Sequence, residues 1–306
     1  MTSAARTVRV FRESGSRKRL LLDDGERLLD LSAYLMQKGQ PNDLLGLFEA
    51  GWFDAGQLSA RLPAEDWDEW DDWTPVDADW DGNAPPGVDV PIDPRDVGKI
   101  LALGKNYRAH AEEFGEAVPA EPMFFNKLPE TLVPHGAVVD VPAWYASRFD
   151  HEAELAVVIG LEGHDIAVDD AYEHVAGYTV ANDLTLRSLQ GTDREKRHPW
   201  FRAKNSDGTC PLGPCFVPRD FLDVSDLRVT AHVGEELRQD ASTRDLVVDV
   251  PHAIAALSRH LTLRPGDLIL TGTPAGVGPL ADGDLCTCTV AGIGELTTTI
   301  RRTSHG

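Results

Sequence analysis

Apolar and polar positions change their spacing along the chain and divide it into two parts. Near the amino terminus, "VRVFRE" and "RLLLDDGERLLDLS" have the spacing of strands, and Asp24-Gly25 predicts a hairpin turn between apolar runs. "AYLMQKG" and "NDLLGLFEAGW" have apolar residues at helical spacing and end at or near glycine. We therefore expect a small α+β domain over residues 1–94, which includes a proline- and glycine-rich linker that begins at Gly82.

The second part, residues 95–306, has a different pattern. From Ile100 onward, short runs rich in Val, Ile, Leu and Thr alternate with glycine and proline, which predicts a β-rich α+β domain with helices at its margins. Within the first part, before the linker, "EDWDEWDDWTPVDADWDG" alternates acidic residues with Trp67, Trp70, Trp73 and Trp80. We expect these tryptophans to pack beneath a solvated acidic face; a carbohydrate platform or an acidic interaction patch is the alternative.

Charge narrows the classes of partner. The 306 residues contain 50 Asp and Glu against 29 Lys and Arg, a net charge of -21, which repels nucleic acids and anionic membrane surfaces. No apolar run has the length of a signal-peptide core or a membrane span, so we expect a soluble cytoplasmic protein. The four cysteines lack the paired C-x-x-C spacing of a zinc site, and we expect them to be buried, reduced and not nucleophilic.

Candidate chemistry begins at "FDHEAELAVVIG". Glu152 and Glu154 are one residue apart at the start of an apolar strand, so both carboxylates should project from the same face. Two like charges this close require either solvent on an exposed strand edge or a cation between them. Asp183 in "GYTVANDLTLRSLQ" offers a third carboxylate at the end of another strand. Three oxygen ligands without clustered His or Cys favour Mg²⁺ or Mn²⁺ over zinc.

Six segments in a fixed order resemble the fumarylacetoacetate hydrolase (FAH) family: "LALGKNYRAHAEEFGE", "PMFFNKLPET", "FDHEAELAVVIG", "GYTVANDLTLRSLQ", "WFRAKNSDGTCPLGP" and "LRPGDLILTGTPAGVG". The likeness covers about Ile100 to Ile300, and the first domain is similar to the amino-terminal module of many bacterial members. The resemblance implies a mixed β-sandwich roll and a homodimer. It also implies that Glu152, Glu154 and Asp183 bind a divalent ion, Mg²⁺, Mn²⁺ or Ca²⁺.

The resemblance also assigns catalytic residues. The family's H-x-x-E dyad, on a short mobile segment, is matched by His110 and Glu113, which are neighbours on one helical turn; a solvated, charge-rich helical turn is the alternative. Lys204 in "RAKNSDG" matches the active-site lysine. Lys127, Arg187 and Gln190 match positions around the same pocket. "TGTPAGVG" lacks the order of a nucleotide-binding loop, and Thr273 within it matches a donor to a substrate carboxylate.

Two departures from the family pattern leave the substrate preference open: "AKNSDG" replaces A-K-S-F-D, and Arg187-Ser188 replaces an arginine-aspartate pair. The implied activity is metal-dependent hydrolysis of a C–C bond in an acylpyruvate-like β-diketo acid, with a small 2-oxo acid as the partner. Oxaloacetate-type decarboxylation, isomerisation or hydration of 2-oxo-enoic acids, and cleavage of dehydrated sugar acids are alternatives from the same family. A metal-stabilised binding protein without turnover is an alternative of another class.

Overall fold

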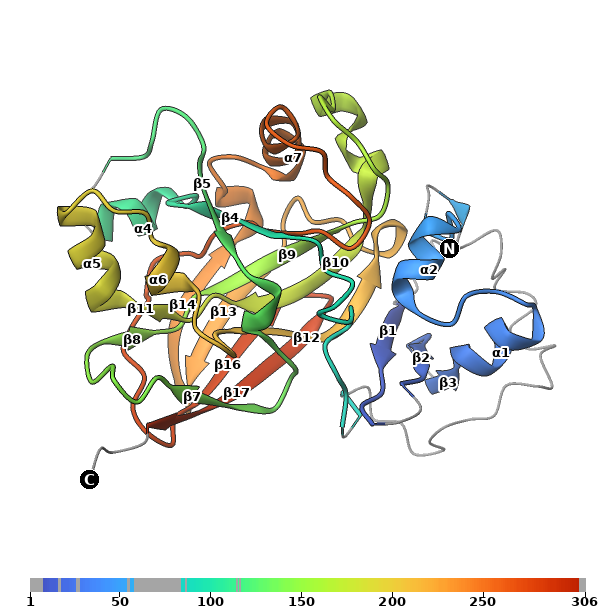
Figure 1. Ribbon diagram of the computed structural model, residues 1–306, viewed down its shortest axis with the longest axis horizontal. Helices are drawn as coiled ribbons and strands as arrows, with labels where there is room; N and C mark the ends of the chain where they lie inside the picture. The colour runs from blue at the N-terminus through green and yellow to red at the C-terminus, as the bar shows by residue number, and fades with distance from the viewer. Residues whose placement is uncertain are drawn as a thin grey trace, which may run out of the picture.

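The computed structural model describes residues 8–15, 18–25, 28–53, 56–57, 84–85, 87–113, 115 and 117–302. Two β-sheets occupy the centre of the molecule, the amino-terminal elements lie at one end, and the chain ends at the other (Figure 1). Helices lie around the sheets, which confirms the expected β-rich α+β class. The tryptophan-rich stretch lies outside the described residues, so its predicted packing stays a prediction.

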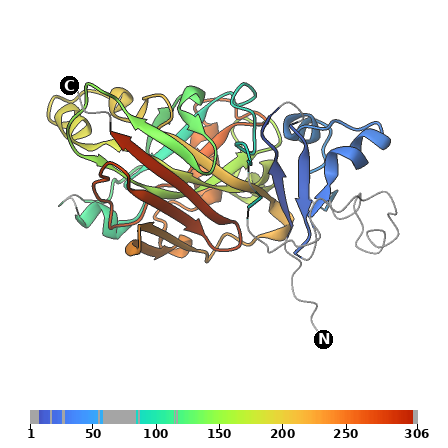
Figure 2. The same ribbon diagram turned by 90° about the horizontal axis from the view of Figure 1, so that it is seen from below.

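The amino-terminal elements follow the predicted order. They are β1 (Arg9–Arg12), β2 (Leu20–Asp23), β3 (Leu28–Asp30), α1 (Leu31–Gln37) and α2 (Leu44–Glu49). Gly25 has φ 93° in the β2–β3 connection, as expected of a turn glycine. β1 pairs with β12 through Val10 and Phe216, so this hairpin extends the large sheet (Figure 2). The proposed domain boundary near residue 94 stays a prediction.

The remaining strands form two mixed sheets, neither of which closes on itself. The larger has the order β3-β2-β1-β12-β10-β9-β15-β4-β5, with β6 also paired to β12, and the second has the order β14-β13-β16-β17-β7. The strands of the larger sheet not yet given are β4 (Ile100–Gly104), β5 (Met123–Lys127), β6 (Leu132–Val133), β9 (Ala153–Ile159), β10 (Val175–Asn182), β12 (Cys210–Pro218) and β15 (Leu268–Leu270). Those of the second sheet are β7 (Ala137–Val141), β13 (Arg228–Val233), β14 (Glu236–Ser242), β16 (Leu285–Val290) and β17 (Gly294–Arg302). β8 (Phe149–Asp150) and β11 (Thr185–Leu186) pair separately.

The helices lie outside the sheets. They are α4 (Arg108–Glu113), α5 (Arg187–Glu195), α6 (Phe201–Lys204) and α7 (Val250–Ser258), with 3-10 turns η1 (Pro129–Thr131), η2 (Val168–His174), η3 (Arg219–Phe221) and η4 (Thr243–Asp245). Among the described helices, not one has both the length and the apolar character that a bilayer crossing requires.

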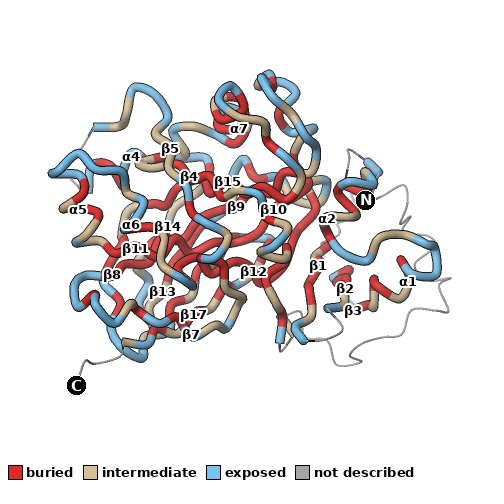
Figure 3. Tube along the Cα trace, viewed as in Figure 1, coloured by how far each residue is buried: buried red, intermediate tan, exposed pale blue. Residues whose placement is uncertain are grey.

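β9 is buried on both faces, which explains its continuous apolar run. Leu155, Val157 and Ile159 belong to one hydrophobic core, whereas Ala156 and Val158 belong to a second core that includes residues of α1 and α2. In Figure 3 the central strands β9, β10 and β12 are buried along most of their length. Because side chains alternate along a strand, Glu152 and Glu154 lie on the same face as Ala156 and Val158. The sheet therefore carries two carboxylates into the interior at one end of β9.

The four cysteines confirm the expectation of reduced thiols. All four are free and buried. Burial raises the pKa of the Cys210 and Cys215 thiols to about 12, so both are protonated at neutral pH. Their place is in the core.

Candidate active site

The pairing of β9 with β10 brings three carboxylates together. Glu152 directly precedes β9, Glu154 lies in it, and Asp183 directly follows β10, whose Asn182 pairs with Ala153. The Asp183 N–H donates to the Glu152 carbonyl oxygen over 2.9 Å, which fixes the two chain segments. One carboxylate oxygen of each residue lies within 4.8 Å of the other two, and all three residues are buried. Because β9 lies between β10 and β15, the exposed-edge alternative is wrong.

Three basic residues surround the carboxylates unevenly. Lys204 Nζ lies 2.7 Å from Glu152 Oε2 and 2.6 Å from Asp183 Oδ2. Lys127 Nζ lies 2.9 Å from Asp183 Oδ1, and Arg187 donates to Glu152. Glu154 instead accepts the backbone N–H of Gly272 over 2.5 Å, and no cation of the described residues pairs with it. Gly272 adopts φ 94°, and a Cβ there would lie 2.8 Å from the Asn106 side chain, so the turn requires glycine.

The pKa shifts follow this uneven distribution of charge. Burial, together with the charges of Asp183 and Glu152, raises the pKa of Glu154 well above its ordinary value. Burial acts in the same direction on Glu152, but Lys204 and Arg187 outweigh it and hold that pKa low. Burial lowers the pKa of Lys204, and the two neighbouring carboxylates more than reverse this effect. Burial and the neighbouring carboxylates therefore favour a proton or a bound cation at Glu154.

These residues fit a divalent cation on the chemistry of their donors. The three acidic side chains offer only oxygen ligands at one point, as hard cations such as Mg²⁺, Mn²⁺ and Ca²⁺ prefer. A bound cation would offset the repulsion between Glu154 and the carboxylates of Asp183 and Glu152, which the basic residues do not fully cancel. The site therefore fits a divalent ion.

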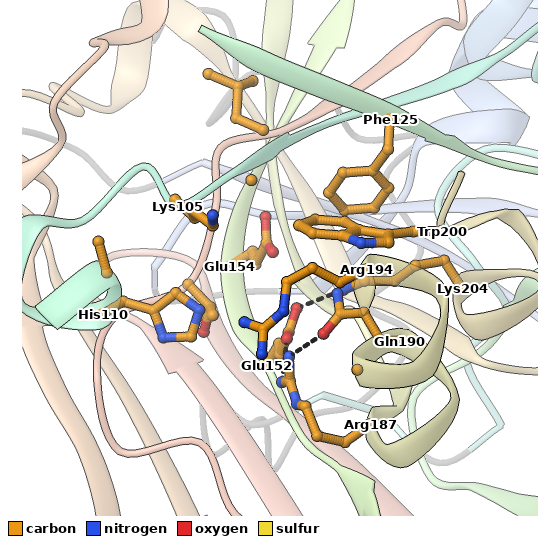
Figure 4. Close-up of a pocket in the computed structure, with 15 residues that line it drawn as sticks. Lys105, His110, Phe125, Glu152, Glu154, Arg187, Gln190, Arg194, Trp200 and Lys204 are labelled. Carbon is orange, nitrogen blue, oxygen red and sulfur yellow. Dashed lines mark hydrogen bonds and ion pairs between the residues drawn. The ribbon is translucent and has the colours of Figure 1, made fainter. Parts of the chain in front are cut away.

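A cavity of about 190 Å³ opens beside the carboxylates. Most of the predicted site residues line it: His110, Glu152, Glu154, Arg187, Gln190, Lys204 and Thr273. Figure 4 shows the His110 imidazole on one side of the cavity and Gln190 and Lys204 on the other, with Glu152 and Glu154 between them. The arrangement faces an imidazole toward a group of buried carboxylates across a space that a small molecule can fill.

The His110–Glu113 pair lies on α4, as the spacing predicts. His110 Nδ1 is 3.3 Å from Glu113 Oε2, and the Glu113 carboxylate also accepts the Gly276 N–H, 3.2 Å from Oε1. Burial would raise the pKa of Glu113, but the hydrogen bonds from His110 and Gly276 lower it. A Cβ at Gly276 would lie 1.9 Å from the Arg238 carbonyl oxygen, so only glycine fits there. His110 itself is only 7% exposed, so its side chain is not solvated as the alternative of a charge-rich helical turn requires.

Lys127 does not reach the cavity. Its side chain is fully buried behind Lys204, where Nζ donates to the Lys204 carbonyl oxygen over 2.6 Å and pairs with Asp183. The prediction placed Lys127 around the pocket; β5 instead carries it beneath the site, where it holds other site residues. The functional roles of all ten site residues stay predictions.

Among the cavity-lining residues with charged or aromatic side chains, sequence reasoning missed Lys105, Phe125, Arg194 and Trp200. Arg194 and Trp200 belong to the charged segment "DREKRHPW", whose composition fits a solvated loop as well as a loop that steers acids inward. Lys105 directly follows β4 within the first family-like segment, and this proximity was the available signal. Burial and the neighbouring charge of Arg194 lower the pKa of Lys105.

One departure from the family pattern has a structural explanation. Asn205, next to Lys204, accepts the Leu128 N–H at Oδ1 over 2.6 Å and donates from Nδ2 to the carbonyl oxygens of Asn126 and Phe201. These bonds tie the end of α6 to β5, so Asn205 supports the segment that carries Lys204.

Comparison with known proteins identifies the family of this chain. The family described as fumarylacetoacetate (FAA) hydrolase C-terminal matches residues 99–301. Oxaloacetate tautomerase YisK of Bacillus subtilis is 42% identical over 218 residues, which is 68% of this chain and 71% of YisK. The chain belongs to the FAH family.

Two solved structures extend the comparison. Fumarylpyruvate hydrolase from Pseudomonas aeruginosa, in complex with Mn²⁺ and pyruvate, is 35% identical with a TM-score of 0.65, covering 68% of this chain and 91% of that one. 5-Carboxymethyl-2-hydroxymuconate delta-isomerase from Mycobacterium smegmatis is 31% identical with a TM-score of 0.70, covering 97% and 100%. The family fold is confirmed, and the similar proteins include a tautomerase, a hydrolase and an isomerase.

Proposed function

We propose that this protein is a divalent-metal-dependent hydrolase that cleaves a carbon–carbon bond in an acylpyruvate-like β-diketo acid. The observation that supports this most is that His110 faces Glu152 and Glu154 across one cavity (Figure 4). A general base and a cation site on opposite sides of a substrate can act on two of its carbonyl groups at once. The likeness to a fumarylpyruvate hydrolase that binds Mn²⁺ and pyruvate supports the same substrate class.

The binding roles follow from charge and position. A cation held by Glu152, Glu154 and Asp183 would supply Lewis acidity toward the 2-oxo group. Arg187, Gln190 and Thr273 line the cavity and would bind the substrate carboxylate. The Lys204 ammonium would stabilise negative charge that develops on the pyruvate part of the substrate.

The chemical step requires a base beside the distal carbonyl group. His110, oriented by Glu113, would accept a proton from water as the water oxygen bonds to the distal carbonyl carbon. The bond between that carbon and C3 then breaks, and its electron pair passes to the pyruvate fragment. Protonation at C3 gives pyruvate, and the other fragment leaves as a carboxylic acid.

Oxaloacetate tautomerisation is a second candidate, favoured by the 42% identity to YisK. In that reaction His110 would move a proton between C3 and the 2-oxygen, and no water would be consumed. Decarboxylation of oxaloacetate and isomerisation of 2-oxo-enoic acids use the same binding groups. These reactions differ from hydrolysis in their products, so product analysis separates them.

The test is a substrate panel assayed with Mg²⁺ or Mn²⁺ and with a chelator. Acylpyruvates and oxaloacetate are followed by pyruvate release, CO₂ release and the ultraviolet absorbance of the enol form. Hydrolysis releases pyruvate and acid from acylpyruvates, whereas tautomerisation changes enol absorbance without releasing pyruvate. Absence of metal-dependent pyruvate release from every acylpyruvate would contradict the leading proposal.

A further inference from the structure

Gln239, a fully buried residue of β14, uses every hydrogen-bonding position of its amide. Its Oε1 accepts the Ala153 N–H over 3.0 Å and lies 3.2 Å from His151 Nδ1. Its Nε2 donates to Thr273 Oγ1 and to the Pro274 carbonyl oxygen, each over 2.7 Å. A glutamine amide has two acceptor positions and two N–H groups, so all four are occupied.

These partners fix the orientation of the amide. The Ala153 N–H can only donate and the Pro274 carbonyl can only accept, so exchanging Oε1 and Nε2 would break both contacts. Because Oε1 is an acceptor, the His151 Nδ1 position must carry the hydrogen. The second sheet thereby joins the start of β9, beside Glu152, to the loop that carries Thr273.

The same geometry determines what Thr273 can do. Its hydroxyl oxygen accepts from Gln239, so the hydroxyl proton points elsewhere. Within the described part of the chain, no protein acceptor is found for this proton, and Thr273 lines the cavity. The remaining direction for donation is toward a molecule in the cavity.

We infer that Gln239 is a positioning residue that holds the Thr273 hydroxyl as a hydrogen-bond donor to a carboxylate oxygen of the substrate. This inference rests on the proposed function, because it requires a 2-oxo acid in the cavity. Gln239 lines no part of the cavity and acts through Thr273. Removing its N–H groups should therefore affect binding of the acid through Thr273 and the adjoining Pro274 of the same loop.

The experiment measures pyruvate binding by calorimetry at saturating Mn²⁺ and pH 8, with Mn²⁺ affinity measured separately for each variant. Thr273→Val should weaken pyruvate binding by about ten- to a hundredfold, the range for a hydrogen bond to a charged group. Thr273→Ser, which keeps the hydroxyl, should bind near the wild-type level. Gln239→Glu should weaken binding similarly, because its carboxylate accepts the Thr273 proton. Gln57→Glu, at an exposed position, controls for the added charge.

A double variant, Thr273→Val with Gln239→Glu, distinguishes a positioning role of Gln239 from a general structural effect of the substitution. In the Thr273→Val background, Gln239→Glu should cause no further loss of pyruvate affinity. The inference would be overturned if the two losses of pyruvate affinity multiply in the double variant, or if Thr273→Val alone leaves the affinity unchanged. If Gln239→Glu does not fold, Gln239→Met, which removes the N–H donors together with the Oε1 acceptor, is measured with and without Thr273→Val, and it too should cause no further loss in the Thr273→Val background.

Failure of the proposed function gives different results. A wild-type protein that binds pyruvate with the expected variant pattern, yet hydrolyses no acylpyruvate, contradicts the proposed reaction and leaves the role of Gln239 standing. A wild-type protein that binds no pyruvate at saturating Mn²⁺ overturns both.

Discussion

Lys127 donates a hydrogen bond from its ammonium group to the backbone carbonyl oxygen of Lys204 over 2.6 Å. Both side chains are almost completely buried, and both ammonium groups contact Asp183. One lysine thus fixes the backbone of the other while sharing its carboxylate partner. This relationship makes Lys127 a support of the site, with no surface from which to attract a substrate.

We expect Lys127→Met to destabilise the fold. Breaking a buried ion pair by removing one partner costs about 3 kcal/mol or more, because the remaining charge stays buried. Since Lys204 also loses its backbone anchor, kcat should fall more than KM rises. Thermal denaturation and steady-state kinetics measure the two effects. Lys38→Met, an exposed lysine, is the control, and an unchanged Tm with only a raised KM would contradict the supporting role.

A second prediction concerns Glu154, whose pKa is raised by burial and by the two neighbouring carboxylates. Glu154→Gln keeps an oxygen for the Gly272 N–H but removes a carboxyl group whose ionised form this environment disfavours. In chelator, the variant should be at least as stable as the wild type. Its affinity for Mn²⁺ should fall by roughly tenfold or more, because affinity depends on ligand charge.

Thermal shift with and without Mn²⁺ checks both parts of this prediction. Glu112→Gln, an exposed glutamate on α4, is the matched control. A variant that is less stable in chelator and is still stabilised by Mn²⁺ as strongly as the wild type would remove Glu154 from the metal site.

The pKa of Glu154 also predicts a dependence of stability on pH. Because its pKa in the folded protein is raised, the folded state keeps a proton that the unfolded chain releases above its ordinary value of 4.5. Folding stability of the metal-free protein should therefore fall as pH rises above 4.5, by at most about 1.4 kcal/mol per pH unit. Glu152 acts oppositely, since its lowered pKa costs stability as pH falls below 4.5.

Urea denaturation in chelator between pH 5 and 8 isolates the contribution of Glu154. The difference in unfolding free energy between the wild type and Glu154→Gln should change with pH in this range. A constant difference would mean that Glu154 is ionised in the folded protein throughout.

Alternation along β9 was sufficient to predict that Glu152 and Glu154 share a face, because strand geometry depends on local sequence. The convergence of Asp183 depends on the register of β9 with β10, and here the family resemblance supplied what local pattern could not. The depth of Lys127 was not predictable, since an alternating strand does not reveal what covers each face. The pairing of β1 with β12 joins segments far apart in sequence, and pattern alone does not encode such contacts.

The last prediction tests the proposed role of His110 as the general base. His110→Ala should lower turnover by roughly 10² or more, as expected for loss of a general base, while Mn²⁺ affinity stays near the wild-type value. Because His110 is largely buried, some loss of thermal stability is expected, unlike for an exposed residue. His252→Ala is the matched control: His252 also pairs with an acidic residue three positions away, with Nδ1 2.6 Å from Asp249 Oδ1, but it is at an exposed position of α7. If His110→Ala turns over substrate as fast as His252→Ala, His110 is not the base, and the cavity needs another proton acceptor.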